Sequence, residues 1–333
     1  MVSQLLELYN AYEEDPSVKL VIIKGEGKAF CAGGAVSVLL NVSWKEAAIL
    51  FSTAYTLDYL IATYAKTQVS LIRGIVMGGG AAFAVHGRFR VVTDDTVFAM
   101  PETALGLFPD VGASYYLSRL PGFFGEYVGL TGARLDGAEM LACGLATHFV
   151  PLEKFPALED ALCKANTGDP KIINNIIHDF SNKNPKLKEK SHVFRYIFFV
   201  CNRENPSGKL MGPYQYTVKH NVQCKEEEAD KNKDDWISWT IKTLKKASPT
   251  SLKISLRSIR TGRLQGVGQC LIREYRMSCT VIRGKVCRDF YEVPIYYYIS
   301  SIKRLQSTGA STICLNIIYA WHMYCIRYRW NYT

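Results

Sequence analysis

Two carboxyl groups stand eight positions apart in an apolar stretch of the chain, where they could do acid–base chemistry. Glu102 and Asp110 are the only ionisable side chains of residues 100–112, which read MPETALGLFPDVG. Apolar surroundings raise the pKa of a carboxyl group by desolvation, which suits proton transfer near neutral pH. The structural alternative is that Glu102 opens a helix and Asp110 caps a turn.

Two glycine-rich turns precede this carboxyl pair. Residues 29–34 read AFCAGG, and residues 74–80 read GIVMGGG and run into an alanine-rich helix start. Such turns present free backbone N–H groups, and two of them that converge form an oxyanion hole for a carbonyl that gains negative charge. No Lys-Ser/Thr follows the last glycine, as a Walker loop requires. Phe83 stands where a dinucleotide fingerprint needs a small residue. The alternative is a tight strand-to-helix connection.

The elements that must position these residues alternate between strands and helices. The helices are expected at the N-terminus, from the spacing of Leu5, Leu8, Tyr9 and Tyr12, at Trp44–Thr63, and after Ser248-Pro249. The strands are expected at Val18–Lys24, Val69–Ile75, Phe89–Thr93 and Thr96–Met100. This alternation predicts an α/β fold.

Charge and cysteine content bound the classes of function. Residues 1–150 carry a net charge of −4 and the rest of the chain +14, which gives +10 for the 333 residues. A basic half can bind polyanions, but no RNA-binding aromatic signature or zinc-finger spacing accompanies it, so we expect no nucleic-acid partner. The 10 cysteines form no CxxC pair, so we expect free thiols and no metal site.

One stretch raises the question of a membrane span. The 22 residues between Arg304 and Arg327 contain no Asp, Glu, Lys or Arg. Polar side chains, among them Gln306, Asn316 and His322, disfavour their insertion into a bilayer. We therefore expect no membrane partner.

The order of the motifs resembles the enoyl-CoA hydratase/isomerase superfamily. The order is CAGG, GGG and PETALGLFPDVG, followed by LPG at 120–122 and TGARL at 131–135. Within it, GLFPDVGASYYLSRLPG and GLATHFVP resemble the 3-hydroxyisobutyryl-CoA hydrolases, especially their plant peroxisomal members. The resemblance continues from Trp236 to Phe290.

This resemblance implies an α/β fold with a crotonase (ClpP-like) ββα spiral core and a helical C-terminal region. Residues 1–165 would form the core, 166–235 a divergent linker, 236–292 the helical region, and 293–333 a tail unlike the family. Family members open with a β-strand that is not found before the first helix here, so the sheet edge next to Val18–Lys24 is expected to be unpaired.

The resemblance also implies a reaction, the hydrolysis of 3-hydroxyisobutyryl-CoA to 3-hydroxyisobutyrate and CoA in valine catabolism. Glu102 would attack the acyl carbonyl or activate a water, and Asp110 would orient the substrate or assist proton transfer. Gly34 and Gly79 would supply the oxyanion-hole N–H groups. The further substrate-binding positions would be Ala32, Gly33, Gly78 and Gly80.

Coenzyme A would be part of the substrate, so neither a metal nor a separate cofactor is expected. A homo-oligomer is possible, and the family resemblance suggests a peroxisome or, alternatively, a mitochondrion.

Three positions distinguish the chain from its superfamily. Hydratases carry a second catalytic Glu two residues after the triple glycine, where this chain has Ala82, so hydrolysis is favoured over hydration. Ala35 and Ala54 replace acidic residues of the family. Together with His192–Lys225, which does not resemble the family, they keep an alternative open: a catalytically impaired crotonase-like protein that binds CoA esters or partner subunits.

Overall fold

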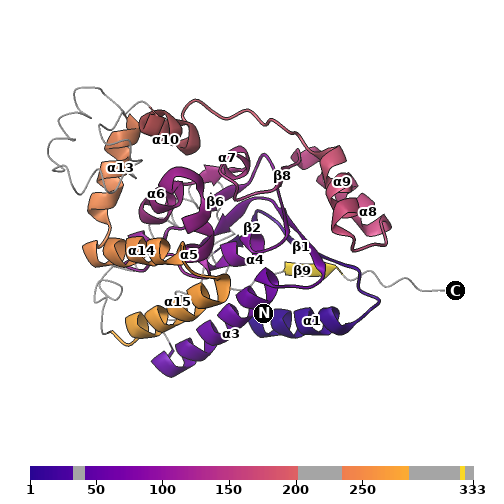
Figure 1. Cartoon of the computed structure of the whole chain (residues 1–333), viewed down its shortest axis with the longest axis horizontal. Coiled ribbons are helices and arrows are strands. Elements are labelled where there is room, and N and C mark those ends of the chain that lie inside the picture. Colours follow the sequence, from indigo (N-terminus) through magenta and orange to yellow (C-terminus); the bar gives the residue numbers. More distant parts are fainter. Residues whose placement is uncertain (33–41, 202–234, 285–322, 327–333) are drawn as a thin grey trace.

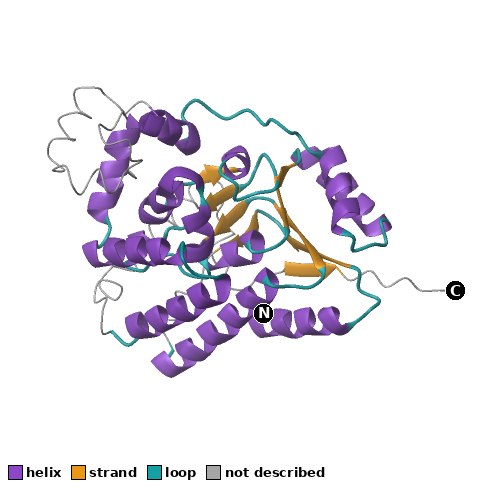
Figure 2. Cartoon of the chain, viewed as in Figure 1, coloured by secondary structure: helices purple, strands orange, loops and turns teal. Residues whose placement is uncertain are grey.

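The computed structural model describes residues 1–32, 42–201, 235–284 and 323–326. Two sheets form the centre of the molecule, and helices surround them (Figures 1 and 2). The first sheet has the order β8-β5-β3-β1-β9 and the second the order β2-β4-β6-β7. The strands of the first sheet are β1 (Leu20–Gly25), β3 (Thr67–Ile72), β5 (Phe89–Val92), β8 (His148–Phe149) and β9 (Met323–Ile326). The strands of the second are β2 (Ala29–Ala32), β4 (Ile75–Met77), β6 (Val97–Ala99) and β7 (Leu135–Asp136).

Most of the strand pairs are parallel. Only β9, against β1, and β7, against β6, run antiparallel to their neighbours among the described strands. Parallel strands need crossover connections, and the helices of the chain provide them. The α/β fold class predicted from the sequence is confirmed.

The first sheet is buried on both faces, as its β-branched sequence requires. Successive side chains of β1 point to opposite faces, so Val21 and Ile23 enter the main core while Ile22 enters a second one. That second core is closed by α8 (Phe155–Lys164) and α9 (Pro170–Phe180), which lie together beside the sheet in Figure 1.

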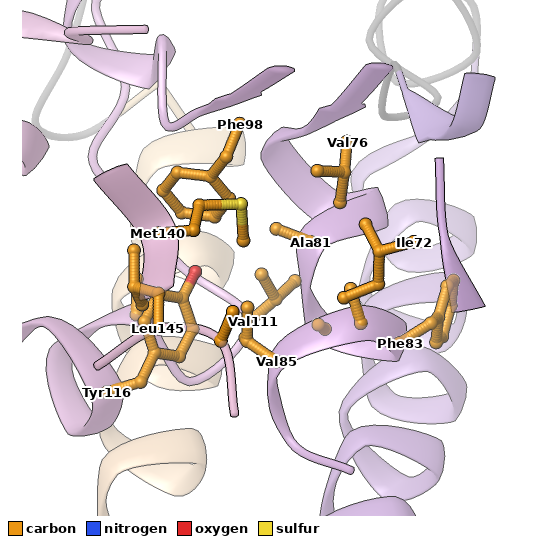
Figure 3. Close-up of a cluster of buried hydrophobic side chains, with 14 of the residues drawn as sticks. Ile72, Val76, Ala81, Phe83, Val85, Phe98, Val111, Tyr116, Met140 and Leu145 are labelled. Atoms are coloured by element: carbon orange, nitrogen blue, oxygen red, sulfur yellow. The ribbon is translucent and has the colours of Figure 1, made fainter. Parts of the chain in front are cut away.

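The main core is built from side chains of both sheets and of the helices that cover them. Figure 3 shows part of this core, in which Val111 and Tyr116 lie with Val85 and Met140. The helices around it are α1 (Val2–Glu14), α3 (Trp44–Ala62), α4 (Ala81–Val85), α5 (Ala113–Tyr116), α6 (Phe124–Thr131), α7 (Gly137–Ala142), α10 (His192–Cys201), α13 (Asp235–Lys246), α14 (Pro249–Gly262) and α15 (Val267–Ile282). Short 3₁₀ helices complete the list: η1 (Gly78–Gly80), η2 (Glu102–Leu105), η3 (Leu117–Arg119), η4 (Pro121–Phe123) and η5 (Leu152–Lys154).

The helix starts follow the local sequence. Ser248 accepts a hydrogen bond from the N–H of Ser251, and Pro249 occupies the first turn of α14, as expected. Ser43 and Glu46 form a capping box at the start of α3. This box fixes the start of a 19-residue helix that packs along α15, as Figure 1 shows.

The structure corrects three expectations. The strand expected at Val69–Ile75 is two strands in different sheets, because Gly74 adopts a positive φ of 64° and turns the chain between them. The edge of β1 is not unpaired, because β9 pairs with it antiparallel over Ile22–Gly25. The segment expected as a linker, 166–235, contains α9 and α10, and Ile173 of α9 is fully buried.

Several expectations lie outside the described residues. They concern Gly33, Gly34 and Ala35, and most of the 293–333 tail with its uncharged stretch. Among the helices that are described, none is long and apolar enough to cross a membrane.

Candidate active site

Three parallel strands carry the expected site residues to one edge of the second sheet. In the order β2-β4-β6, Ala32 pairs with Met77, and Met77 pairs with Ala99. Each of these is the last residue of its strand. The segments that follow therefore leave the sheet side by side, and in open parallel sheets this carboxyl edge is where ligands bind.

The glycine turn after β4 is built for close approach. Gly78 has a φ of 58°, and a Cβ placed on it would lie 2.9 Å from Oε1 of Glu102. A Cβ on Gly80 would lie 2.4 Å from the carbonyl oxygen of Cys31 in β2. The sequence therefore needs glycine here, once to seat a carboxyl group and once to bring the two turns together. Gly79 lies between these two contacts, in η1.

Glu102 opens η2 directly after β6, with its carboxyl group against Gly78. The residue is 7% exposed, and its Oε2 has no hydrogen-bond partner among the described residues. Burial raises the pKa of Glu102 well above its ordinary value, and the negative charge of Asp110 raises it further. A carboxyl group with an uncommitted oxygen in a dry site is free to act on a substrate.

Asp110 lies in the loop after η2 and is held by a tyrosine from a distant helix. The hydroxyl of Tyr55 on α3 donates a hydrogen bond of 2.6 Å to Oδ2 of Asp110. Since the hydrogen of that hydroxyl is used in the bond to Asp110, the hydroxyl of Ser278 on α15 is the donor in the 3.0 Å hydrogen bond to the oxygen of Tyr55. Burial raises the pKa of Asp110 to about 6, and the bond from Tyr55 partly opposes the shift.

The turn that follows Asp110 is strained. Val111 has a φ of 54°, which is unfavourable for a β-branched residue and costs on the order of 1–3 kcal/mol. Burial of the Val111 side chain in the main core offsets part of this strain. The carbonyl of Val111 accepts a 2.9 Å hydrogen bond from Nε2 of His86. Burial lowers the pKa of His86 to about 4, so the ring is neutral and Nε2 carries the proton that it donates.

Two further carboxyl groups are buried near this loop. Asp58 follows Tyr55 by one turn of α3, and neither of its carboxyl oxygens has a hydrogen-bond partner within the described part of the chain. Burial raises the pKa of Asp58 well above its ordinary value, and the charges of Asp110 and Glu274 add to the shift. Burial raises the pKa of Glu274 on α15 to about 7. Four acids thus share one dry region, which favours their partial protonation at neutral pH.

A small cavity of about 30 Å³ opens beside Asp110. Its walls come from α3, from the loop after η2 and from α15, and they are mainly apolar. The lining residues are Phe51, Leu107, Phe108, Asp110, Ser278, Val281 and Ile282. Asp110 and Ser278 are therefore the polar residues in a wall that is otherwise apolar.

The structure brings together the predicted residues that it describes. Glu102 contacts Gly78, and Gly80 contacts the β2 strand that ends in Ala32. The partner loop of the expected oxyanion hole, with Gly33 and Gly34, lies outside the described residues. Among those that are described, no group of three or more His, Cys, Asp or Glu side chains could hold a metal ion.

Sequence reasoning missed the residues that hold Asp110 in place. Tyr55 and Ser278 contact each other across 223 positions of the chain. Both residues stand on the apolar face of a predicted helix, where a buried polar group needs a hydrogen-bond partner. That placement is the feature of the sequence that could have indicated them.

The fold and the site define a class of protein, and comparison with known sequences names it. A family model described as enoyl-CoA hydratase/isomerase matches residues 1–293. The chain therefore belongs to the enoyl-CoA hydratase/isomerase family, in the branch of the 3-hydroxyisobutyryl-CoA hydrolases. The matched range includes His192–Lys225, which was expected to be unlike the family, and stops where the 293–333 tail begins.

Individual relatives give the degree of similarity. The 3-hydroxyisobutyryl-CoA hydrolase 1 of Arabidopsis thaliana is 59% identical over 297 residues, which are 88% of this chain and 75% of that protein. The small ribosomal subunit protein mS47 of the same plant is 40% identical over 296 residues, 88% of this chain and 70% of the relative. Among solved structures, a carnitinyl-CoA dehydratase from Mycobacterium thermoresistibile has a TM-score of 0.73 at 29% identity, covering 90% of this chain and 81% of the other.

Proposed function

We propose that the chain hydrolyses the thioester of 3-hydroxyisobutyryl-CoA to 3-hydroxyisobutyrate and free CoA, a step of valine catabolism. The observation that carries the proposal is the seat of Glu102, whose carboxyl group lies against Gly78 at the carboxyl edge of three parallel strands. The 59% identical relative with this activity in its name supports the choice of substrate. Coenzyme A enters as part of that substrate, so the proposed reaction uses no separate cofactor.

The two site carboxyl groups divide the work of hydrolysis. In its ionised form Glu102 attacks the acyl carbonyl or takes a proton from the attacking water, and Asp110 orients the substrate or assists proton transfer. The C–S bond breaks, the acyl carbon takes the hydroxyl group of the water, and the sulfur of CoA takes the remaining proton. Burial raises the pKa of Asp110 to about 6, which suits a group that holds a proton and passes it to the leaving thiolate near neutral pH.

The carbonyl oxygen needs hydrogen-bond donors while it carries negative charge. The N–H of Gly79, in the turn after β4, is the donor that we assign on this side of the site. We assign the second N–H to Gly34, which follows β2, the neighbour of β4 in the sheet. Loss of one such donor lowers kcat by about 10²–10³-fold.

Hydration of a double bond is disfavoured by the residue that follows the triple glycine. Ala82 lies fully buried in α4, where hydratases of the superfamily carry a second catalytic Glu. Addition of water across a double bond needs that paired acid and base. The carboxyl groups that remain, Glu102 and Asp110, fit hydrolysis.

The test is release of free thiol from a small panel of acyl-CoAs. The purified chain should turn over 3-hydroxyisobutyryl-CoA in preference to longer and unhydroxylated acyl-CoAs. Glu102→Gln should lower kcat by at least about 10³-fold, since it removes the attacking or basic group. Glu159→Gln is the matched control, because that carboxylate lies on α8 and pairs with Lys24. Equal rates for wild type and Glu102→Gln would refute the role of Glu102.

A second function, binding of CoA esters or partner subunits without turnover, is supported by one comparison. A relative at 40% identity is named a ribosomal subunit protein. Ala54, which precedes Tyr55 on α3, also removes a carboxylate that the family resemblance expects beside the substrate. This function predicts saturable binding of the CoA ester with no thiol release, and recovery of release when Ala54 is changed to Glu together with Ala35→Asp.

A further inference from the structure

Glu274 is a fully buried carboxylate, and the side-chain hydrogen bonds that it makes within the described part of the chain lie in the segment just after Asp110. It sits on α15, 162 positions away along the chain, and is 0% exposed. One oxygen accepts a 2.6 Å bond from the N–H of Gly112, and the other accepts a 2.9 Å bond from the N–H of Ser114. The hydroxyl of Ser114 donates to the same oxygen. A buried charge is tolerated only when it is hydrogen-bonded in this way.

These bonds hold a turn that would otherwise relax. Asp110 is followed by Val111 in a left-handed conformation and by Gly112 with a φ of 80°. Strained backbone persists where the surroundings determine it from several sides. Here His86 binds the carbonyl of Val111 on one side, and Glu274 binds the next free N–H groups on the other.

The same helix also reaches the carboxyl group of Asp110 from a second direction. Ser278 lies four residues after Glu274, on the same face of α15. It donates to Tyr55, which donates to Asp110. One face of α15 therefore fixes both the backbone after Asp110 and the side chain of Asp110.

We propose that Glu274 is a positioning residue, which sets the place of the Asp110 carboxylate through the N–H groups of Gly112 and Ser114. The inference rests on the proposed function, in which Asp110 is the second carboxyl group of the reaction. It extends the active site to the C-terminal helix α15, which the sequence motifs did not include.

Glu274→Gln is the sharpest test, because it keeps the shape of the side chain but turns an NH₂ group toward backbone N–H groups. The variant should lose kcat by about 10–100-fold at an unchanged KM for the acyl-CoA, as residues that orient a reacting group do. In an Asp110→Asn background, the same change should lower kcat less than about twofold further, because the group that Glu274 positions is already gone.

Glu139→Gln is the matched control. Glu139 is also buried, at 4% exposure, and accepts backbone N–H bonds from Asp136 and Val193. It lies on α7, and its change should leave kcat unaltered while it lowers the melting temperature in the same way. Ser114→Ala removes the hydroxyl that donates to Glu274 and accepts a 2.7 Å bond from Arg273, and it should lower kcat a few-fold in the wild-type background and not in Asp110→Asn.

Two outcomes overturn the inference. One is wild-type kcat in both Glu274→Gln and Ser114→Ala; the other is an equal loss of kcat in the presence and absence of Asp110. The unfolding free energies of the four proteins in the cycle give a second readout that needs no turnover, and they should not be additive. If the wild-type chain released no thiol, the proposed function would fail, while additive unfolding free energies would still refute the coupling of Glu274 to Asp110.

Discussion

Replacement of Asp110 by Asn should make the protein more stable at neutral pH while it impairs the site. Burial raises the pKa of this carboxyl group from an ordinary 3.8 to about 6. At about 1.4 kcal/mol for each unit of pKa, the ionised form destabilises the folded state by about 3 kcal/mol. The amide oxygen of Asn can still accept the hydrogen bond from the hydroxyl of Tyr55, and the Asn side chain carries no charge. The variant should therefore recover that free energy.

The sign and the pH window follow from the raised pKa. Below about pH 4 the carboxyl group is protonated in both the folded and the unfolded chain, so the charge contributes nothing. Between pH 4 and pH 6 the unfolded chain releases its proton and the folded chain retains it, so wild-type stability falls as the pH rises. The advantage of Asp110→Asn should therefore grow across this window and be constant above it.

Urea denaturation of wild type and variant at pH 4.5, 6 and 8 measures this advantage. The free energy of unfolding should differ by about 1 kcal/mol or less at the lowest pH and by about 3 kcal/mol at the highest, with equal m-values. At pH 8 the Asp110→Asn variant should also have lost most of the thiol-releasing activity of the wild type. A difference in stability that is independent of pH, or a less stable variant at pH 8, would show that Asp110 is not held against its ionised form.

Three further changes test other parts of the structure. Tyr55→Phe removes the hydrogen bond that lowers the pKa of Asp110, so the limb of the pH–rate profile that Asp110 sets should move to higher pH; two unmoved limbs would mean that Asp110 sets neither. Gly80→Ala places a Cβ 2.4 Å from a carbonyl oxygen of β2, and thermal unfolding should show a loss of about 1–3 kcal/mol together with lower kcat. Glu126→Ala leaves Arg260 on α14, which is 35% exposed, without its buried partner, and should destabilise the chain by about 1–3 kcal/mol in urea, whereas a loss below about 0.5 kcal/mol would mean that the pair behaves as a surface ion pair.

The parts of the fold that the sequence predicted are those with short-range causes. The helix beginning at Pro249 follows from a capping serine and a proline, and the turn at 74–80 follows from its glycines. The division of 69–75 into two strands was not predicted, because a single apolar run is equally compatible with one strand. One strand and two strands are distinguished by the positive φ of Gly74 and by the pairing of β3 and β4 in different sheets.

The candidate site was predictable where its residues stand in motifs and unpredictable where it depends on distant pairing. Glu102 lies against Gly78 because each stands in a short motif directly after a strand, and the paired strands bring these two motifs to one edge of the sheet. Asp110 stands in the same motif as Glu102, whereas Tyr55 stands in none of the motifs. The pairing of Tyr55 with Asp110 spans 55 positions, and no local pattern encodes it.

The polar stripe on α15 contained more information than was used. Cys270, Glu274 and Ser278 recur every four residues and are all buried, so the face that this helix turns to the core carries a carboxylate and a hydroxyl where leucine would be expected. Without partners, two such groups would destabilise the fold by several kcal/mol. The carboxylate therefore required hydrogen-bond donors from elsewhere in the chain. The strained turn after Asp110 supplies them through its free backbone N–H groups. A buried polar stripe on a helix far from the motifs is thus evidence for the site as well as for the fold.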